Sequence, residues 1–366
     1  MCADMVRQAL VSRHLALAGG LGKLVESVGA VLLAFVVGAI LLIAIGKDPT
    51  EAYGALIDGA VGGAGALAYS LVVATPLILA SLAVALSFRS GFFNIGAGGQ
   101  VGVGAIAAAV VGGYLHLSGP LVMALMLVLG GLAGAFWGGM AGLLRAYTGA
   151  SEVITTLMLN YVATLLIDYL VTGPLRAPGP AVQSATIPPD ARFPILLPDT
   201  QLNATLLLAL AAVPAVWLLL WRTTYGFELR MVGLNPEAAR AAGMSVRRVA
   251  SLSLAASGFL AGLAGAVQVG GILGSLPQDF SIQVGFDAIA AALLGANNPW
   301  GVLVASLFLG GLNGGSATME ATVGVSGPFV QFLEAVVIAT VVAAPFALGA
   351  IRPRLAGWVR VGGEVR

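Results

Sequence analysis

Four polar side chains lie in apolar stretches of this chain, where a polar group is costly. Asn94 and Gln100 belong to a long run without any Asp, Glu, Lys or Arg, and Asn160 and Asp287 lie in two further apolar stretches. An amide or carboxylate in such surroundings needs a hydrogen-bond partner or a water-filled path. We therefore predict that these residues, with the neighbouring aromatic Phe92, line a path for a polar solute. Hydrogen bonding between helices is the alternative.

Other chemistry is not indicated by the residues present. The single cysteine, Cys2, cannot form a disulfide within the chain, and two isolated histidines, His14 and His116, cannot build a metal site. The two Gly-Lys pairs are followed by Leu24 and Asp48, whereas a phosphate-binding loop needs Ser or Thr there. We expect no catalytic residue, metal or cofactor in this chain, so any energy from ATP must come from another subunit.

Composition indicates that these residues lie in a membrane. Of the 366 residues, 59% are hydrophobic and 9% are charged, with mean hydropathy +0.99. Soluble domains carry about 25% charged residues. The net charge of +1 gives no preference for nucleic acid. The chain is predicted to be an all-α polytopic transmembrane helical bundle.

Charges and prolines divide the chain into about ten apolar segments. A membrane-spanning helix needs about 20 mostly apolar residues. The eighth segment is short for a span and the ninth carries Gly310, Gly311, Gly314 and Gly315, so broken or re-entrant helices near 282–315 remain open. The ten segments are 28–46, 60–87, 91–115, 119–144, 151–172, 202–221, 249–273, 282–296, 299–315 and 325–346.

The distribution of positive charge predicts the topology. With the N-terminus inside, 14 of the 17 Lys and Arg residues lie on the cytoplasmic side. We therefore expect a cytoplasmic N-terminal segment, 1–27, a transmembrane domain, 28–346, and a cytoplasmic tail, 347–366. The loop 173–201 lies outside and holds seven of the 17 prolines, which favour an extended surface loop. It is either a linker or a docking surface for an extracytoplasmic partner.

Glycine spacing predicts close helix packing. Gly130, Gly134, Gly138 and Gly142 recur every four residues on the fourth segment, and Gly258 with Gly262 repeats the spacing. Small residues four apart let helix backbones approach closely in a membrane. We interpret these glycines as structural.

The cytoplasmic loop 222–248 contains a short helix with clear start and stop signals. Asn235 suits the N-cap, Pro236 the first helical position, Glu237 the positive end of the helix and Gly243 its termination. The residues between are mostly alanine, which favours helix. The sequence predicts about seven helical residues, either an ordinary connection or a small surface that fits a groove on a partner.

Four stretches of this chain together resemble ABC importer permeases. The class is that of binding-protein-dependent nucleoside and simple-sugar uptake, within the branched-chain amino acid and ribose permease superfamily. The match runs in order from about residue 30 to 350. The stretches are Gly91-Phe-Phe-Asn-Ile-Gly-Ala97 with Gly99-Gln100, Glu152 to Tyr161, Asn235 to Arg240 between Gly233 and Gly243, and Gly285-Phe-Asp-Ala-Ile-Ala290 with Asn298-Pro299.

The resemblance implies a function for each part. The chain would be a permease subunit in a bacterial inner membrane that moves a nucleoside, or a simple sugar, by alternating access. Its partners would be a second permease subunit in a heterodimer, a cytoplasmic ATPase that holds ATP and Mg²⁺, and an extracytoplasmic binding protein. Aromatic rings and amides suit nucleoside bases and ribose. The residues that resemble the ATPase-coupling region are Gly233, Asn235, Pro236, Glu237, Ala238, Ala239, Arg240 and Gly243.

One residue departs from the resemblance, and other functions remain open. Gly98 stands where the signature has glutamate. An ion-coupled secondary transporter of a small polar solute would use buried carboxylates, for which Asp287 and Glu334 are candidates. A permease for simple sugars or branched-chain amino acids is a further alternative, and a purely structural membrane scaffold is another.

Overall fold

The structure is a computed structural model that describes residues 28–115, 117–341 and 343. These residues belong to two compact units. Residues 51–327 form the larger unit, and the described parts of the remaining chain form the smaller one.

The smaller unit contains two apolar helices, Val28–Ala44 and Pro328–Val341. The predicted cytoplasmic segments 1–27 and 347–366 lie outside the described residues.

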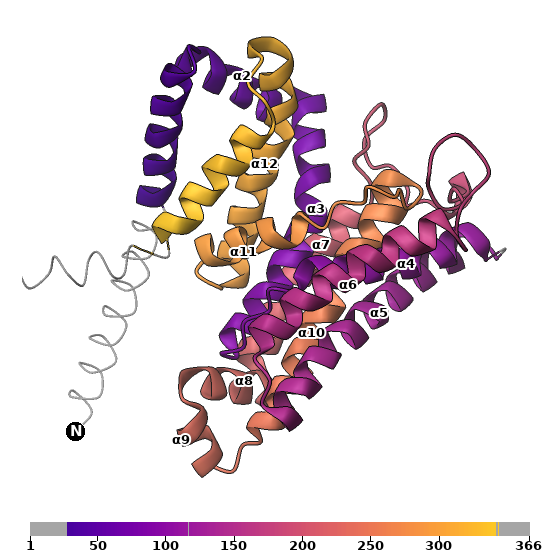
Figure 1. Cartoon of the computed structure of the whole chain (residues 1–366), viewed down its shortest axis with the longest axis vertical. Helices are drawn as coiled ribbons and strands as arrows, with labels where there is room; N and C mark the ends of the chain where they lie inside the picture. Colours follow the sequence, from indigo (N-terminus) through magenta and orange to yellow (C-terminus); the bar gives the residue numbers. More distant parts are fainter. Residues whose placement is uncertain (1–27, 116, 342, 344–366) are drawn as a thin grey trace, which may run out of the picture. The chain divides into compact units, whose positions relative to one another are not determined.

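α-Helices make up most of the rest of the described chain (Figure 1). No β-strand occurs in it, and the all-α prediction is confirmed for this part. The labelled α-helices are α2 (Pro49–Val61), α3 (Ala64–Arg89), α4 (Ala97–Tyr114), α5 (Gly119–Thr148), α6 (Glu152–Thr172), α7 (Thr205–Arg222), α8 (Thr224–Leu234), α9 (Pro236–Ala241), α10 (Val246–Val267), α11 (Val284–Leu294) and α12 (Pro299–Val323).

Seven described helices are long and apolar enough to cross a membrane. They are α3, α4, α5, α6, α7, α12 and α10 with the π-helical turn Gln268–Leu273 that continues it. The other three predicted segments correspond to shorter apolar helices, namely α11 and the two of the smaller unit. The count of ten spans therefore stays a prediction.

The segment 299–315 is not broken, so that alternative is wrong. α12 runs without interruption to Val323. Its glycines pack against neighbouring helices: a Cβ atom at Gly310 would lie 2.6 Å from Cβ of Ala74, and one at Gly314 would lie 2.7 Å from Oγ of Ser70. These glycines are explained by close approach to α3.

The larger unit has a buried centre and outer helices. In α3, 83% of the most apolar window is buried, whereas in α6 only 22% is. α4 and α10 resemble α3, and α5 and α7 resemble α6. Exposed leucines on α5, α6 and α7 therefore form the apolar surface that lipid or another protein would cover.

The glycine ladder packs α5 against α10, which confirms the predicted close packing and identifies the partner helix. A Cβ atom at Gly134 would overlap the carbonyl oxygen of Gly258, and one at Gly262 would overlap that of Gly130. The two backbones touch without side chains between them. This contact allows van der Waals attraction along the stretch of α5 from Gly130 to Gly142.

The proline-rich loop 173–201 contains no α-helix. One 3₁₀ turn, Pro189–Ala191, interrupts it, and an isolated bridge pairs Gln183 with Pro277. The proline-based prediction of a loop in place of a helix is confirmed. Its location outside the cell stays a prediction.

Candidate functional site

The helix predicted in the loop 222–248 forms at the predicted place, as α9. Oδ1 of Asn235 accepts hydrogen bonds of 3.0 Å from the backbone N–H groups of Glu237 and Ala238. At the other end Gly243 has φ +84°, and the N–H of Met244 donates to the carbonyl of Ala239. This is the Schellman arrangement that ends helices at glycine. The local signals therefore fix both ends of α9.

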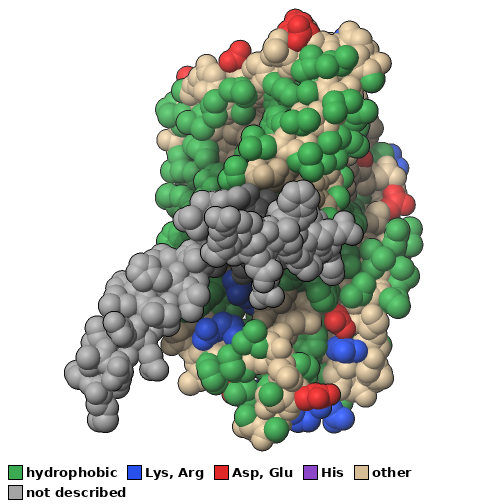
Figure 2. All heavy atoms as spheres, turned by 90° about the vertical axis from the view of Figure 1, so that its left-hand side faces the viewer, with side chains coloured by type: hydrophobic (Ala, Val, Ile, Leu, Met, Phe, Trp, Pro, Cys, Tyr) green, Lys and Arg blue, Asp and Glu red, His purple; other side chains and the backbone are tan. Residues whose placement is uncertain are grey.

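α9 is an exposed element. Among its residues only Ala239 is buried, and Glu237 and Arg240 offer one charge of each sign to the surroundings. On the visible face, Lys and Arg side chains gather toward the lower end, at the height of α8 and α9 in Figure 1 (Figure 2). A small, exposed, charged helix at the end of the bundle can dock on another protein.

The end of α8 touches the end of α3 through bare backbone. A Cβ atom at Gly233 would overlap the carbonyl oxygen of Arg89, and one at Gly91 would lie 3.1 Å from Cα of Gly233. Gly91 has φ +78°, a conformation that glycine adopts without strain. This contact joins the loop that carries α9 to the segment 91–96 that precedes α4.

A cavity of about 760 Å³ lies at this junction. Its wall includes Phe92 and three residues of the predicted coupling set: Gly233, Pro236 and Arg240. The structure therefore places Phe92, which is buried, beside the coupling loop.

Asn94 and Gln100 form a buried amide pair. Nδ2 of Asn94 donates to Oε1 of Gln100 at 2.8 Å, and Nε2 of Gln100 donates to Oδ1 of Asn94 at 3.1 Å. Nδ2 of Asn94 also donates to Oγ of Ser257 at 2.8 Å, and that hydroxyl donates to the carbonyl of Ala83. The pair thereby connects the start of α4 to α10 and α3.

Asn160 holds the same segment to α6. Its Oδ1 accepts a 2.7 Å hydrogen bond from the N–H of Gly99, and its Nδ2 donates to the carbonyl of Ile95 at 2.9 Å. Thr156, one turn earlier, accepts from the N–H of Ile95. The alternative of hydrogen bonding between helices is therefore confirmed for Asn160.

These amides are enclosed by protein. Asn94 is 0%, Gln100 1% and Asn160 3% exposed. Their hydrogen bonds are strong in so apolar a setting and costly to leave unmade. In this conformation they fix the segment 91–100, and their contact with a solute stays a prediction.

Asp287 lies in the first turn of α11, apart from the amide pair. Its Oδ1 accepts a hydrogen bond from Nε2 of Gln283 at 3.1 Å. Just before it, Gly285 packs on Gly98: a Cβ atom at Gly98 would lie 2.7 Å from the carbonyl oxygen of Ile282. The start of α11 thus occupies the space that a side chain at position 98 would need, and the family signature has glutamate at this position.

Charged groups near the loop have identifiable partners. Nε of Arg145 lies 3.2 Å from Oε2 of Glu152, so these two side chains form a salt bridge. In α8, burial raises the pKa of Tyr225 to about 12, with Glu228 adding to the shift and Arg248 opposing it. Tyr225 is therefore neutral at physiological pH.

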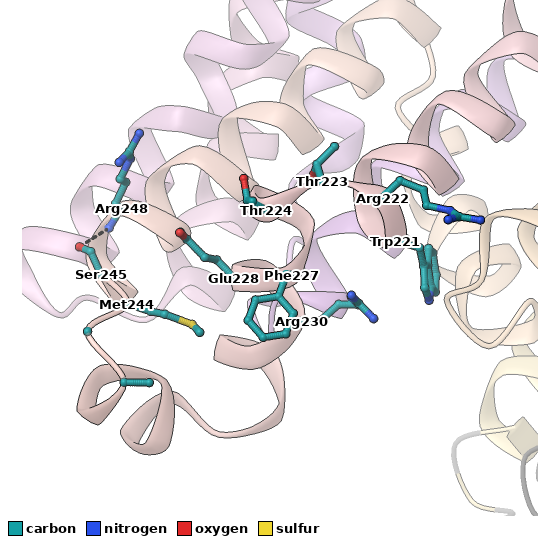
Figure 3. A pocket seen from close by; sticks show the side chains of 12 residues that line it. Trp221, Arg222, Thr223, Thr224, Phe227, Glu228, Arg230, Met244, Ser245 and Arg248 are labelled. Carbon is teal, nitrogen blue, oxygen red and sulfur yellow. Dashed lines mark hydrogen bonds between the residues drawn. The ribbon is translucent and has the colours of Figure 1, made fainter. Parts of the chain in front are cut away.

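A second cavity, of about 690 Å³, opens between α8 and the start of α10 (Figure 3). Thr223 and Ser245, the N-caps of these two helices, both line it. Trp221, Arg222 and Arg230 form another part of its wall.

Sequence reasoning missed Ser257 and Arg89. Ser257 is a polar residue in the apolar helix α10, and that signal could have found it, but its partner Asn94 is 163 positions away. Arg89 was counted only as a cytoplasmic charge. Its Nε donates to the carbonyl of Asn297 at 2.8 Å, which holds the turn between α11 and α12.

The chain matches one protein family over most of its length. The family is described as the permease component of the branched-chain amino acid transport system, and the match covers residues 66–344. No solved structure matches the chain.

Three relatives are similar over most of both sequences. The glucose ABC transporter permease protein TsgB13 of Haloferax volcanii is 38% identical over 86% of each chain. The guanosine ABC transporter permease protein NupP of Bacillus subtilis is 36% identical, over 84% of this chain and 90% of NupP. The nucleoside ABC transporter permease protein NupB of Lactococcus lactis is 36% identical, over 79% of this chain and 83% of NupB.

Proposed function

The chain belongs to the family of permease components of the branched-chain amino acid transport system, and we propose on that premise that it imports a nucleoside. It is a permease subunit of an ABC transporter and an integral membrane protein. The names of NupP and NupB, together with the segment around Asn94, support the nucleoside. The name of TsgB13 supports a simple sugar as the second candidate.

The observation that carries the coupling role is the exposed, doubly capped helix α9. We propose that a cytoplasmic ATPase subunit, which holds ATP and Mg²⁺, binds α9 and displaces it when it closes. Glu237, Ala238, Arg240 and Ala241 are exposed to such a partner, and Asn235 and Gly243 keep the helix short. This chain contributes no ATP-binding loop in our interpretation.

The displacement has a direct route into the bundle. Near the end of α8, Gly233 contacts Arg89 at the end of α3 and the following Gly91. From there the chain continues through Phe92 to Asn94 and the start of α4. We propose that movement of α9 shifts the segment 91–100 and breaks or re-forms its amide hydrogen bonds. Phe92, Asn94, Gln100, Asn160 and Asp287 would then meet the solute in another conformation.

The remaining partners follow from the exposed surfaces. The apolar faces of α5, α6 and α7 offer room for a second, non-identical permease subunit as well as lipid. The loop 173–201 would receive the extracytoplasmic binding protein. The whole assembly would lie in the inner membrane of a bacterium.

Uptake by cells tests the substrate. Cells that express this chain with its ATPase, second permease and binding protein should accumulate labelled guanosine or adenosine, and an ATPase subunit without its catalytic glutamate should abolish the uptake. Uptake of glucose alone would replace the nucleoside with a sugar. Uptake that depends on a proton or sodium gradient and ignores the ATPase would instead favour the ion-coupled transporter.

Substitution of Gly233 tests the coupling route. In Gly233→Ala the new Cβ would overlap the carbonyl oxygen of Arg89, and overpacking of this kind costs about 1–3 kcal/mol. We expect uptake to fall severalfold while the ATPase subunit still co-purifies. Gly54→Ala is the matched control, because nothing lies within 4 Å of a Cβ atom there. Equal uptake by both variants would refute the route.

A further inference from the structure

Three arginines and two tryptophans gather at the end of α7. We call Arg89, Trp217, Trp221, Arg222 and Arg230 the Arg–Trp cluster. The rings of Trp217 and Trp221 stack with centroids 6.4 Å apart and an interplanar angle of 18°. The stacked pair forms a flat aromatic platform.

Each guanidinium group lies over a ring of this platform. Cζ of Arg222 lies 5.7 Å from the Trp217 ring, and those of Arg89 and Arg230 lie 5.5 and 5.8 Å from the Trp221 ring. Figure 3 shows Arg222 and Arg230 extending to the same side as Trp221, away from Ser245 and Arg248. Stacking on the tryptophan rings occupies the flat faces of the guanidinium groups and leaves their N–H edges available for an anion.

The positive charge of the cluster is not neutralised within the described chain. None of its three arginines forms a salt bridge with a described carboxylate. Arg89 uses Nε and Nη2 to bind the carbonyls of Asn297 and Ala296. Arg230 has one long bond from Nε, and the terminal nitrogens of Arg222 and Arg230 have no hydrogen-bond partner among the described residues. Three close positive charges with free donors favour an anionic ligand.

The cluster lies where an apolar helix surface ends. Leu207, Leu210 and Leu218 are 57%, 37% and 50% exposed along α7. Leu210 and Trp217 are seven residues apart, so they share one face of the helix. Tryptophan followed by arginine at the end of an exposed apolar stripe is typical of the boundary between acyl chains and lipid headgroups.

We propose that the Arg–Trp cluster binds the phosphate group of an anionic phospholipid. Arg222 and Arg230 would donate to the phosphate oxygens, Arg89 would add charge, and the acyl chains would follow the leucine face of α7. The assignment of this lipid to the cytoplasmic leaflet rests on the proposed function, which places the loop 222–248 in the cytoplasm. A phospholipid bound there would contact both α7 and α8, next to the loop that carries α9.

Native mass spectrometry of the purified chain tests this proposal without the ATPase or a substrate. The chain in detergent is mixed with phosphatidylglycerol or phosphatidylcholine of the same acyl chains. We expect phosphatidylglycerol to bind about 10-fold more tightly, because each arginine at a membrane surface contributes to the attraction of an anionic headgroup. The double variant Arg222→Gln/Arg230→Gln should lose this preference. Arg247→Gln, an exposed arginine without a tryptophan neighbour, should keep it.

Other outcomes of these measurements distinguish an anionic phospholipid from other ligands. Equal binding of both lipids by the unmodified chain overturns the proposal and needs no variant. Adducts of inorganic phosphate without any preference for phosphatidylglycerol would make the site one for a free anion, and also overturn it. So would a double variant that keeps the lipid preference but loses the ATPase subunit in co-purification. Failure of nucleoside uptake would leave these lipid measurements unaffected.

Discussion

At the scale of single residues, buried amides determine where α4 begins. Asn94 and Gln100 pair within the segment 91–100, and Asn160 reaches the same segment from α6. Asn94 and Asn160 satisfy backbone groups of Ile95, Gly96 and Gly99. An unsatisfied backbone group in such a place costs about 1–3 kcal/mol. These residues are therefore structural in the described conformation, whatever they contact during transport.

Asn160→Ala should lower stability and uptake together. It leaves the N–H of Gly99 and the carbonyl of Ile95 without their partner, so we expect a loss of about 2–4 kcal/mol. Thermal unfolding followed by tryptophan fluorescence in detergent measures it. Thr164→Ala on the same helix is the control, because Thr164 bonds only the backbone of its own helix. An unfolding temperature equal to that of the control would contradict the account.

Gly98→Glu, which restores the residue of the family signature, should not be neutral here. The side chain would meet the carbonyl oxygen of Ile282 and the backbone of Gly285, so the start of α11 must move. We expect reduced uptake and faster proteolysis near 282–285. Gly139→Glu is the control, because a Cβ atom there makes only an ordinary 3.5 Å contact with Ala255. Normal uptake by Gly98→Glu would show that the start of α11 can move without loss of transport.

At the scale of elements, α9 is the case in which local rules suffice. Its N-cap, first-turn proline and terminal glycine are all within nine residues of sequence, so the sequence predicted both ends. The pairing of α5 with α10 was only half predictable. The glycine spacing was visible on each helix, but nothing in it named the partner. The bond of Asn94 to Ser257 and the reason for Gly98 were not predictable, because both depend on residues brought together from distant parts of the chain.

Asn235→Ala should loosen α9 without affecting the bundle. The variant loses two capping hydrogen bonds, which costs about 1 kcal/mol of local stability. We expect faster hydrogen exchange at residues 236–241 and a lower substrate-stimulated ATPase rate of the assembled transporter. Asn235→Asp, which can still cap the helix, should keep both near their original values. Unchanged exchange in Asn235→Ala would mean that packing, and not the cap, holds α9.

At the scale of the whole molecule, the charge distribution predicts which side of the membrane each loop faces. The contacts and hydrogen bonds of the described residues place α9 and the proline-rich loop in the fold, but only the arginine bias says which of them faces the cytoplasm. The ranges 1–27 and 347–366, which carry several of these charges, lie outside the described residues. The orientation therefore needs an experiment of its own.

Cysteine labelling in intact cells tests the orientation. In a Cys2→Ser background, Ala181→Cys in the proline-rich loop should react with a membrane-impermeant maleimide in intact cells. Ala238→Cys on α9 should react only after the membrane is opened. Both positions are exposed, so access to reagent is the only difference between them. The reverse pattern would invert the topology and remove the proposed contact with the ATPase.

The contact between Gly91 and Gly233 has a mechanical consequence. Among the described residues, no hydrogen bond or salt bridge crosses it, and only backbone atoms meet. Such a contact resists compression strongly, whereas separation is opposed there only by van der Waals attraction and, nearby, by the stacking of Arg89 and Arg230 on the Trp221 ring. In the proposed coupling route, movement of α9 toward the bundle would therefore push the start of α4 more directly than its withdrawal would pull it back.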